Sequence, residues 1–531
     1  MNQKQNNLIY FIYFLLTTLL IYFPTIFFDF TYFDDNELIL NNLHFLTKPQ
    51  NLINAFKKDV FFSPSHGFYY RPLLTVSFML DAFFSKSSPL LYHISNVFYH
   101  SLAVCLLFIF LNELKIDRGL AFKLSLIYLV HPILTPAIAW IPGRNDPLMA
   151  IFLFPALIWL LKYLKSDQAK YLIYHLIFTS LALLTKETAI MITVVSITFI
   201  VLVLKDYSKL PKIIFSWIVI VTVIFMIRQE VLGKLTYLNI IELINSIIKN
   251  LPAIAFYITN FLVPIQLSVF PILKDINISL NLAISLIFII TTAILKPKKN
   301  RLYLFGLIWF LSFNILNLIK PNISTVPEFL THRSYTAIVG LIIMIASLNK
   351  IKALLSNKYV FTSLITVLAF LSFLFQFNFS DRLTFWSKAV SASPHSSLAH
   401  KNYGVMLYFE NDYQQALKHY QTALKLNPQE PIVHNNIGVI YMDQGRYELA
   451  IDEFEKELKI NPNYDKALYN LGIVYYLLKQ DQKAEKYWLE TLKINPNHAG
   501  AYFRLANLYQ EKKDYDKAKH YYSLWQNFNP N

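Results

Sequence analysis

Two adjacent carboxylates stand directly after the first long apolar run of the chain. Asp34 and Asp35 lie in "FDDNELILNN", and the run before them, roughly residues 8–28, is long enough to cross a bilayer. A carboxylate held at a membrane surface can take a proton from an incoming hydroxyl group. The sequence does not separate the two acids, so either could be this base. The alternative is a solvated loop end that only helps to orient the first span.

Cationic residues and histidines follow in short motifs that could bind a phosphate. The motifs are "YYRPL", "YHISNVFYH", "VHPILTPAIAWIPGRND", "LLTKET" and "FLTHRSY". An arginine fork donates two parallel hydrogen bonds to a phosphate, and fixed positive groups stabilise a departing phosphate. Such cations and one base suffice for glycosyl transfer from a lipid phosphate. The candidate phosphate-binding residues are Arg71, Arg144, Lys186 and Arg333, and the candidate supporting residues are His93, His131, Asp146, Glu187 and His332.

Each of these residues also has a purely structural interpretation. An arginine can anchor a helix end at the interface, and a histidine before proline can simply end a helix. Charges inside a membrane usually neutralise one another. The structural alternatives are an interfacial anchor for Arg71, a helix end for His131, local ion pairs for Arg144–Asp146 and Lys186–Glu187, and a hydrogen-bonded core position for His332.

The composition places most of the chain in a membrane. Apolar residues make up 55% and charged residues 15% of the sequence, whereas a soluble protein carries about 25% charged residues. The net charge is +15, yet residues 395–531 hold 16 basic and 16 acidic residues, so the excess lies in the apolar part. That distribution indicates positive cytoplasmic loops and no nucleic-acid partner. The single cysteine, Cys105, cannot form an internal disulfide.

Lysine-rich connections orient the spans, because short basic loops face the cytoplasm. The segments 112–123, 162–170, 205–212, 296–301 and 348–358 are such loops. With them inside, the N-terminus is inside and every motif above lies on the outer face. The segment 248–273 contains three prolines and is expected not to cross. The eleven predicted spans are 8–28, 90–111, 121–141, 147–164, 171–185, 188–204, 213–228, 279–295, 302–319, 333–348 and 359–378.

A strict repeat of 34 residues ends the chain. Prolines fall at positions 394, 428, 462, 496 and 530, and small residues, alanines and aromatic residues recur at the same step. The pattern resembles the tetratricopeptide repeat, in which two helices pack through a small residue and an aromatic side chain. Four repeats are enough to bury a continuous core.

The ordered set of motifs, followed by these repeats, resembles the transmembrane and tetratricopeptide repeat-containing O-mannosyltransferases and their prokaryotic relatives. These are C-type glycosyltransferases. The resemblance implies a polyprenyl-phosphate sugar as donor, a protein or peptide acceptor bound through the repeats, and a catalytic acid at Asp34 or Asp35. The protein O-mannosyltransferases are metal-independent, whereas related oligosaccharyltransferases use a divalent ion. Two carboxylates without a third ligand favour no metal and no other cofactor.

The sequence thus predicts an all-α protein with three parts. Residues 1–380 form a polytopic bundle of about eleven spans, residues 381–394 a linker, and residues 395–531 an extracytoplasmic solenoid. The expected function is transfer of a monosaccharide, such as mannose, to an acceptor hydroxyl at the outer face. The location is a bacterial inner membrane, or the endoplasmic reticulum in a eukaryote. The alternatives are a membrane-anchored repeat scaffold for envelope complexes and an oligosaccharide polymerase or ligase.

Overall fold

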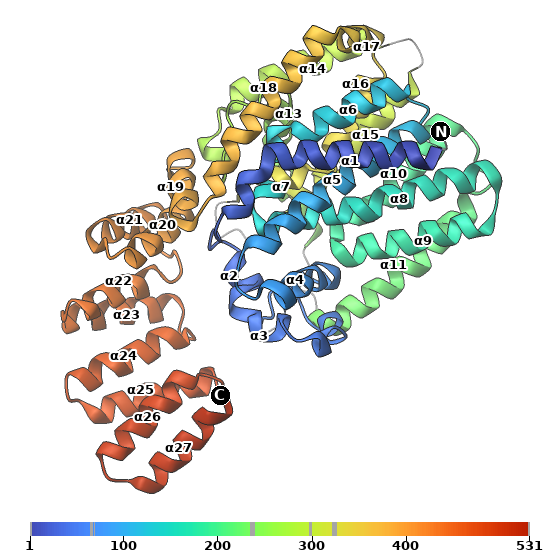
Figure 1. The fold of residues 1–531 in the computed structure, drawn as a ribbon. Coiled ribbons are helices and arrows are strands. Elements are labelled where there is room, and N and C mark those ends of the chain that lie inside the picture. The colour runs from blue at the N-terminus through green and yellow to red at the C-terminus, as the bar shows by residue number, and fades with distance from the viewer. Residues whose placement is uncertain are drawn as a thin grey trace. The chain divides into compact units, whose positions relative to one another are not determined.

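The computed structural model describes residues 3–63, 67, 69–233, 239–296, 300–320 and 327–528 of the chain. Throughout these ranges the regular structure is helical, with one isolated antiparallel bridge between Ile272 and Glu328. The chain divides into two compact units, Met1–Ser393 and Pro394–Asn531, referred to below as the membrane unit and the repeat unit. The predicted all-α class is therefore confirmed (Figure 1).

Nine helices among the described residues are long and apolar enough to cross a membrane, or up to eleven if two bent pairs each count as one. The bent pairs are Arg118–Val130 (α6) with Pro132–Ala139, at 53°, and Ile338–Ala346 (α16) with Asn349–Ser356 (α17), at 89°. Helices α4 (Pro72–Ser85) and α9 (Ala169–Thr185) are shorter, so the predicted span 171–185 falls on a helix below this length. The nine are Asn7–Phe27 (α1, Gln3–Tyr22, with η1), Leu90–Glu113 (α5), Ile141–Ser166 (η6 and α8, Asn145–Ser166), Glu187–Leu204 (η7, α10 and η8), Leu210–Leu232 (α11), Ile240–Leu262 (α12, Ile240–Asn250, and α13, Pro252–Leu262), Ile278–Leu295 (α14), Arg301–Leu318 (α15, Arg301–Ile315, and η10) and Lys358–Phe379 (α18, Lys358–Gln376, and η12).

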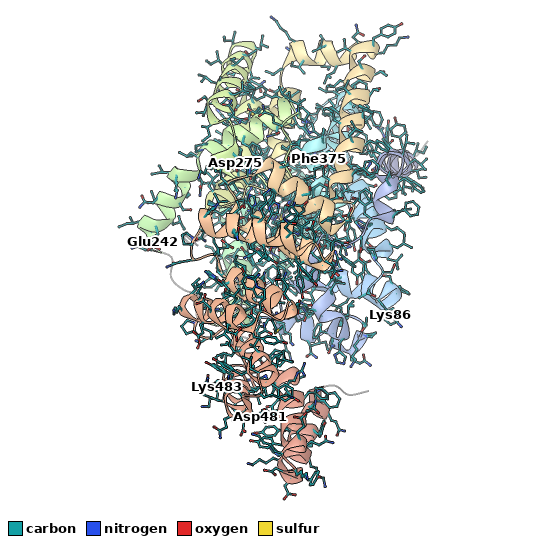
Figure 2. The ribbon with its side chains drawn as sticks, turned by 90° about the vertical axis from the view of Figure 1, so that its left-hand side faces the viewer. Lys86, Glu242, Asp275, Phe375, Asp481 and Lys483 are labelled. Atoms are coloured by element: carbon teal, nitrogen blue, oxygen red, sulfur yellow. The ribbon has the colours of Figure 1, made fainter. Side chains whose placement is uncertain are left out.

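One of these nine differs from the prediction. The segment 248–273 was expected not to cross, yet the helix pair Ile240–Leu262 has the length and hydropathy of a span. Its prolines do not break it, because Pro252 occupies the first turn of α13, where an N–H group has no helical partner to bond. Pro264 and Pro271 come after the helix has ended at Leu262. Figure 2 shows α12, labelled at Glu242, at an edge of the membrane unit.

The centre of the membrane unit is formed by α5 and α8. Their apolar windows are 61% and 72% buried by other helices, against 11% for α11 and 17% for α14. Helix α5 packs against both α1 and α8, and α8 packs against α9 (Figure 1). A helix that is apolar all round and little buried by protein has lipid as its remaining neighbour. Helices α11 and α14 are therefore the lipid-facing ones.

Helices α15 and α16 cross at two glycines. A Cβ atom on Gly306 of α15 would lie 2.6 Å from the carbonyl oxygen of Gly340 on α16, and one on Gly340 would meet the carbonyl oxygen of Gly306. Small residues at such a crossing let two backbones approach closely. The crossing fixes the start of α16, just after the short helix Thr331–Ser334 (η11).

The segment predicted as a linker is an integral part of the membrane unit. Arg382–Ala392 forms α19, capped by Asp381, which accepts a hydrogen bond from the Thr384 amide at 2.8 Å. Trp386 on α19 is fully buried and donates from Nε1 to the Thr31 carbonyl oxygen at 3.1 Å. The boundary between the two units falls at Ser393–Pro394. The sequence did not show that α19 belongs to the membrane unit, because Thr31, to which Trp386 of α19 donates, lies about 350 residues earlier.

The repeat unit consists of four helix pairs, as predicted. A Cβ atom on Gly404 or Gly438 would lie within 2.6–2.7 Å of the ring of Tyr420 or Phe454, which explains the small residue at this position. The aromatic residue of each pair thus fills the space that the glycine leaves. The pairs are Ser397–Phe409 (α20) with Tyr413–Leu426 (α21), Val433–Asp443 (α22) with Tyr447–Ile460 (α23), Asp465–Leu477 (α24) with Asp481–Ile494 (α25), and Ala499–Glu511 (α26) with Tyr515–Phe528 (α27).

Candidate active site

The two acids after the first span have different surroundings. Asp35 is fully buried and begins the short helix Asp35–Leu38 (α2). Its Oδ2 accepts hydrogen bonds from the Thr31 amide at 3.0 Å and the Thr31 hydroxyl at 2.5 Å. The Thr31 carbonyl in turn accepts from Trp386 of α19. Asp35 is therefore committed to holding the loop against the membrane unit.

Asp34 occupies the N-cap position of α2 and is partly exposed. Burial of its carboxyl group raises its pKa to about 7, and the neighbouring charge of Asp35 acts in the same direction. Arg333 and Arg71 lower this pKa, while Glu328 raises it. A carboxyl group whose pKa lies near neutrality can accept a proton and release it again at physiological pH. Asp34 is thus the better placed of the two acids to act as a base.

Four cations from separate parts of the chain act electrostatically on one buried histidine. The pKa of His332 lies well below its usual value, first because of burial and then because of the charges of Lys186, Arg333, Arg71 and Lys320. Arg71 precedes α4, Lys186 follows α9, Lys320 follows η10, and Arg333 lies in η11. Three of these four cations were predicted as phosphate ligands. The structure therefore brings them together around His332, and it brings two of them near Asp34.

Carboxylates from other helices pair with these cations. Arg71 binds Glu187 through two bonds of 2.9 and 2.5 Å. Lys186 donates to Asp146 at 2.7 Å and to the Asn145 side chain at 3.0 Å. The local pair Lys186–Glu187, which was the structural alternative, is not formed, and each residue pairs with a distant segment instead. Arg71 and Lys186 each pair with a carboxylate at least 40 residues away in the sequence. The residues next to them in the chain do not indicate these partners.

The fourth predicted phosphate ligand, Arg144, does not join this cluster. Its side chain is completely buried, and it donates to Asp81 at 2.5 Å, to the Asn96 side chain at 2.9 Å and to the Tyr92 carbonyl at 2.7 Å. The ring of Phe78 lies 4.6 Å from its guanidinium carbon. The expected pair Arg144–Asp146 is not formed, and no side of the guanidinium group is open to a phosphate.

Two of the predicted supporting histidines are internal residues. Nε2 of His131 lies 2.8 Å from the Phe261 carbonyl, and its Nδ1 accepts from the Ile133 amide at 3.3 Å. This is the helix-end role that was the alternative for His131. His93 is buried within α5, edge-on to the ring of Phe28.

Two charged residues of the cluster have no counterpart among the predicted site residues. Glu328 binds Arg333 at 2.6 Å and Lys320 at 3.5 Å, and the side chains of all three are mostly buried. Burial would raise the pKa of the Glu328 carboxyl, but the two cations hold it down at about 2. Both residues flank the loop that leads from α15 and η10 to η11, where charges at the ends of "KPNISTVPE" were the available signal. Residues 321–326 of that loop lie outside the described residues.

Aromatic rings enclose the residue before Asp34. The ring of Phe33 is stacked on Trp140 and Phe385, at 5.5 and 6.2 Å between ring centres, and meets Phe270 and Trp386 edge-on. Trp140 also contacts His332, at 5.2 Å between ring centres. The loop of Asp34 and the histidine at the centre of the cation cluster are thus joined through Trp140.

The described residues contain no group of three or more His, Cys, Asp or Glu side chains placed to hold a metal ion. One carboxyl group, Asp34, and the paired cations supply charged groups for chemistry at the site. A hydroxyl group near Asp34 could lose its proton there, and negative charge developing nearby would meet Arg71 and Arg333.

Comparison with known proteins supports this assignment of motifs and repeats. Sequence profiles described as TPR repeat and tetratricopeptide repeat match residues 404–445, 438–479, 465–498 and 487–520. The Caenorhabditis elegans protein O-mannosyl-transferase F38B6.6 is 32% identical over 167 residues, which are 30% of this chain and 23% of that protein. Mouse protein O-mannosyl-transferase TMTC1 is 36% identical over 135 residues, 23% of this chain and 14% of its own length.

The match covers less than a quarter of these relatives' length. The Drosophila melanogaster protein O-mannosyl-transferase Tmtc1 is also similar, at 31% identity over 163 residues, which are 30% of this chain and 19% of that protein. Among solved structures, Pseudomonas aeruginosa PilF matches 27% of this chain and 65% of its own at 27% identity and a TM-score of 0.26. The resemblance to the transmembrane and tetratricopeptide repeat-containing O-mannosyltransferases is confirmed by the named relatives and the repeat profiles.

Proposed function

We propose that the chain is an integral membrane glycosyltransferase that moves a monosaccharide from a polyprenyl-phosphate donor to an acceptor hydroxyl group on a protein. The observation that carries the proposal is the partly exposed carboxyl group of Asp34, with a pKa near 7, in the field of Arg71 and Arg333. The names of the relatives support mannose as the sugar. The spans support a multi-pass membrane location, with donor, acid loop and repeat unit at the extracytoplasmic face.

In this mechanism Asp34 takes the proton of the acceptor hydroxyl group as its oxygen attacks the anomeric carbon of the sugar. The new carbon–oxygen bond forms while the bond from that carbon to the phosphate oxygen breaks. The electron pair of the broken bond leaves with the polyprenyl phosphate. Arg71, Lys186 and Arg333 stabilise the charge that develops there, because fixed cations in a water-poor site need little reorganisation. The proton is then released from Asp34 to water.

The acids and histidines around the cations have supporting roles. Glu187 and Asp146 hold Arg71 and Lys186 in place through short bonds to other helices. His332 remains neutral among the four cations and contacts Trp140. Asp35 is fully buried and fixes the loop through Thr31, whereas the partly exposed Asp34 exchanges protons with the acceptor.

The test is transfer from a mannosyl polyprenyl phosphate to an acceptor peptide by the purified full-length chain. We expect Asp34→Asn to reduce the rate by about 100-fold or more, the range for loss of a general base. Asp167→Asn is the matched control, because that acid is exposed and ends α8. Full activity of Asp34→Asn would contradict the base assignment. A repeat scaffold, the non-enzymatic alternative, requires no transfer by the native chain at all.

A further inference from the structure

The charges of the cation cluster do not balance one for one. Two of its cations have a carboxylate each, in the pairs Arg71–Glu187 and Lys186–Asp146. Lys320 and Arg333 instead share the single carboxylate of Glu328. These two cations therefore have one ion-pair partner between them among the described residues. A mostly buried cation that shares its carboxylate can gain from an anionic ligand.

Lys320 is the loosely held member of this group. Its ammonium nitrogen lies 3.5 Å from Glu328 Oε1, whereas the Arg333 guanidinium lies 2.6 Å from the same atom. The ammonium also lies 5.6 Å from the ring centre of Phe329. An ammonium group has three donors, and within the described part of the chain these two contacts use few of them. Lys320 can therefore bind a further acceptor without giving up a strong bond.

Both cations are held by fixed backbone. The Lys320 amide donates to the Ser246 hydroxyl of α12 at 2.9 Å, and Asn250 of α12 donates to the Leu318 carbonyl at 2.9 Å. The Asn317 side chain donates to the Arg333 carbonyl at 3.0 Å. Groups that are positioned before the ligand arrives lose less entropy when it binds.

Glu328 is also anchored through its backbone. Glu328 pairs with Ile272 in the one isolated bridge, and the Phe329 amide donates to the Pro271 carbonyl at 2.8 Å. Its carboxylate can therefore leave the two cations by rotation of the side chain alone, without movement of the chain around it.

We propose that Lys320 and Arg333 form a phosphate seat, and that the Glu328 carboxylate occupies this seat until a phosphate displaces it. This inference rests on the proposed function for its ligand, a polyprenyl phosphodiester, which carries one negative charge, as the Glu328 carboxylate does. The arginine fork supplies two directed bonds to phosphate oxygens, and lysine supplies a mobile point charge. Displacement of one carboxylate by one phosphodiester then exchanges one anion for another at the two cations.

The experiment measures equilibrium binding of mannosyl undecaprenyl phosphate, a phosphodiester, to the full chain in lipid nanodiscs, with no acceptor present. We expect Lys320→Gln to weaken binding by about tenfold or more, which is the loss of one charge-assisted contact. Glu328→Gln removes the competing carboxylate and should tighten binding by a similar factor. Lys86→Gln is the matched control, since Lys86 is exposed after α4 (Figure 2). Thermal unfolding checks that each variant is folded.

Either of two results would overturn the phosphate seat. Native affinity in a folded Lys320→Gln variant would remove Lys320 from the seat, and weaker binding by Glu328→Gln would show that Glu328 helps to hold the ligand. Competition by inorganic phosphate would show that free phosphate can occupy the seat. Binding of undecaprenol, which lacks the phosphate, would show that the lipid chain binds without it. Binding is measured without transfer, so the two proposals can fail separately. If the native chain is active but the variants bind the ligand as tightly as it does, only the phosphate seat is refuted. Correct binding changes in an inactive chain refute only the proposed function.

Discussion

Asp34 and Asp35 are neighbours in sequence and have opposite tasks because of one threonine. Thr31 gives Asp35 two hydrogen bonds and is itself held by Trp386, whereas Asp34 faces the cations of the cluster. Their types and spacing predict an acidic pair at the membrane surface. They do not predict which of the two acids is the base. That depends on Thr31, whose carbonyl accepts a hydrogen bond from Trp386 of α19, at the other end of the membrane unit.

The pH dependence of transfer should report the Asp34 carboxyl group. A base is active when deprotonated, so kcat/KM should rise with pH through a midpoint near 7, the raised pKa of this group. Arg333 lowers that pKa, so Arg333→Gln should move the midpoint to higher pH. The charge of Asp35 raises it, so Asp35→Asn should move the midpoint to lower pH. Rate profiles between pH 5 and 9 measure both shifts, and identical midpoints in all three proteins would contradict this assignment.

Arg144 and Arg71 should respond differently to the same substitution. Arg144→Gln leaves Asp81 buried without its cation and should cost about 3–5 kcal/mol of unfolding free energy, as for other broken buried ion pairs. Arg71, whose side chain is 13% exposed, contributes to the open cluster. Arg71→Gln should therefore reduce transfer while affecting stability less. Thermal unfolding in detergent, together with activity per folded molecule, separates these outcomes. Equal loss of stability in the two variants would make Arg71 a structural residue too.

Among the elements, the crossing of α15 and α16 controls the position of Arg333. Gly340→Val would place side-chain atoms against the Gly306 carbonyl and force the helices apart. Overpacking of this kind typically costs about 1–3 kcal/mol. Because η11 directly precedes α16, the change should also weaken polyprenyl-phosphate binding. Gly119→Ala is the control, since a Cβ atom there meets only the Asp117 side chain at 3.3 Å. Unchanged melting of Gly340→Val would contradict the tight crossing.

The repeat helices could be predicted almost completely, and the helices around the site only in part. Period-34 positions determine both the small residue and the ring that packs on it, so each repeat is encoded within itself. The role of α12 is not encoded in this way. Ser246 and Asn250 bond to the backbone of Leu318 and Lys320, about 70 residues later. The prolines nearby suggested a segment that does not cross, yet α12 and α13, which meet at Leu251, together have the length of a span.

For the whole molecule, sidedness can be tested with single cysteines, because the chain has only Cys105, which is buried. In a Cys105→Ser background, Lys86→Cys and Lys479→Cys should react with a membrane-impermeant maleimide added outside. Asp167→Cys and Lys296→Cys should not react. The reason is that lysine-rich connections stay in the cytoplasm. Outside labelling of Lys296→Cys alone would show that Ile240–Leu262 crosses and that the predicted order of later spans is wrong.

The sequence predicts the two-part organisation because each part depends on a local pattern, hydropathy or repeat period. Loop charge, read from the same pattern, predicts one common face for the motifs. The candidate site depends instead on pairs between segments that are far apart in sequence. Arg144 and Arg71 look alike in their motifs, yet the first finds Asp81 inside the bundle and the second finds Glu187 at the cluster. Lys320 and Glu328 carry no motif, and only their shared contact with Arg333 identifies them.

The rings around Phe33 have a consequence for how cleanly the enzyme would work. A base able to activate an alcohol can equally activate a solvent molecule, which would release the sugar as a free hexose. On the Phe33 side, any such molecule would have to pass between Trp140, Phe270, Phe385 and Trp386, which contact that ring from several directions. Hydrolysis of the bound donor should therefore be slow relative to transfer to the acceptor, even while no acceptor protein is bound.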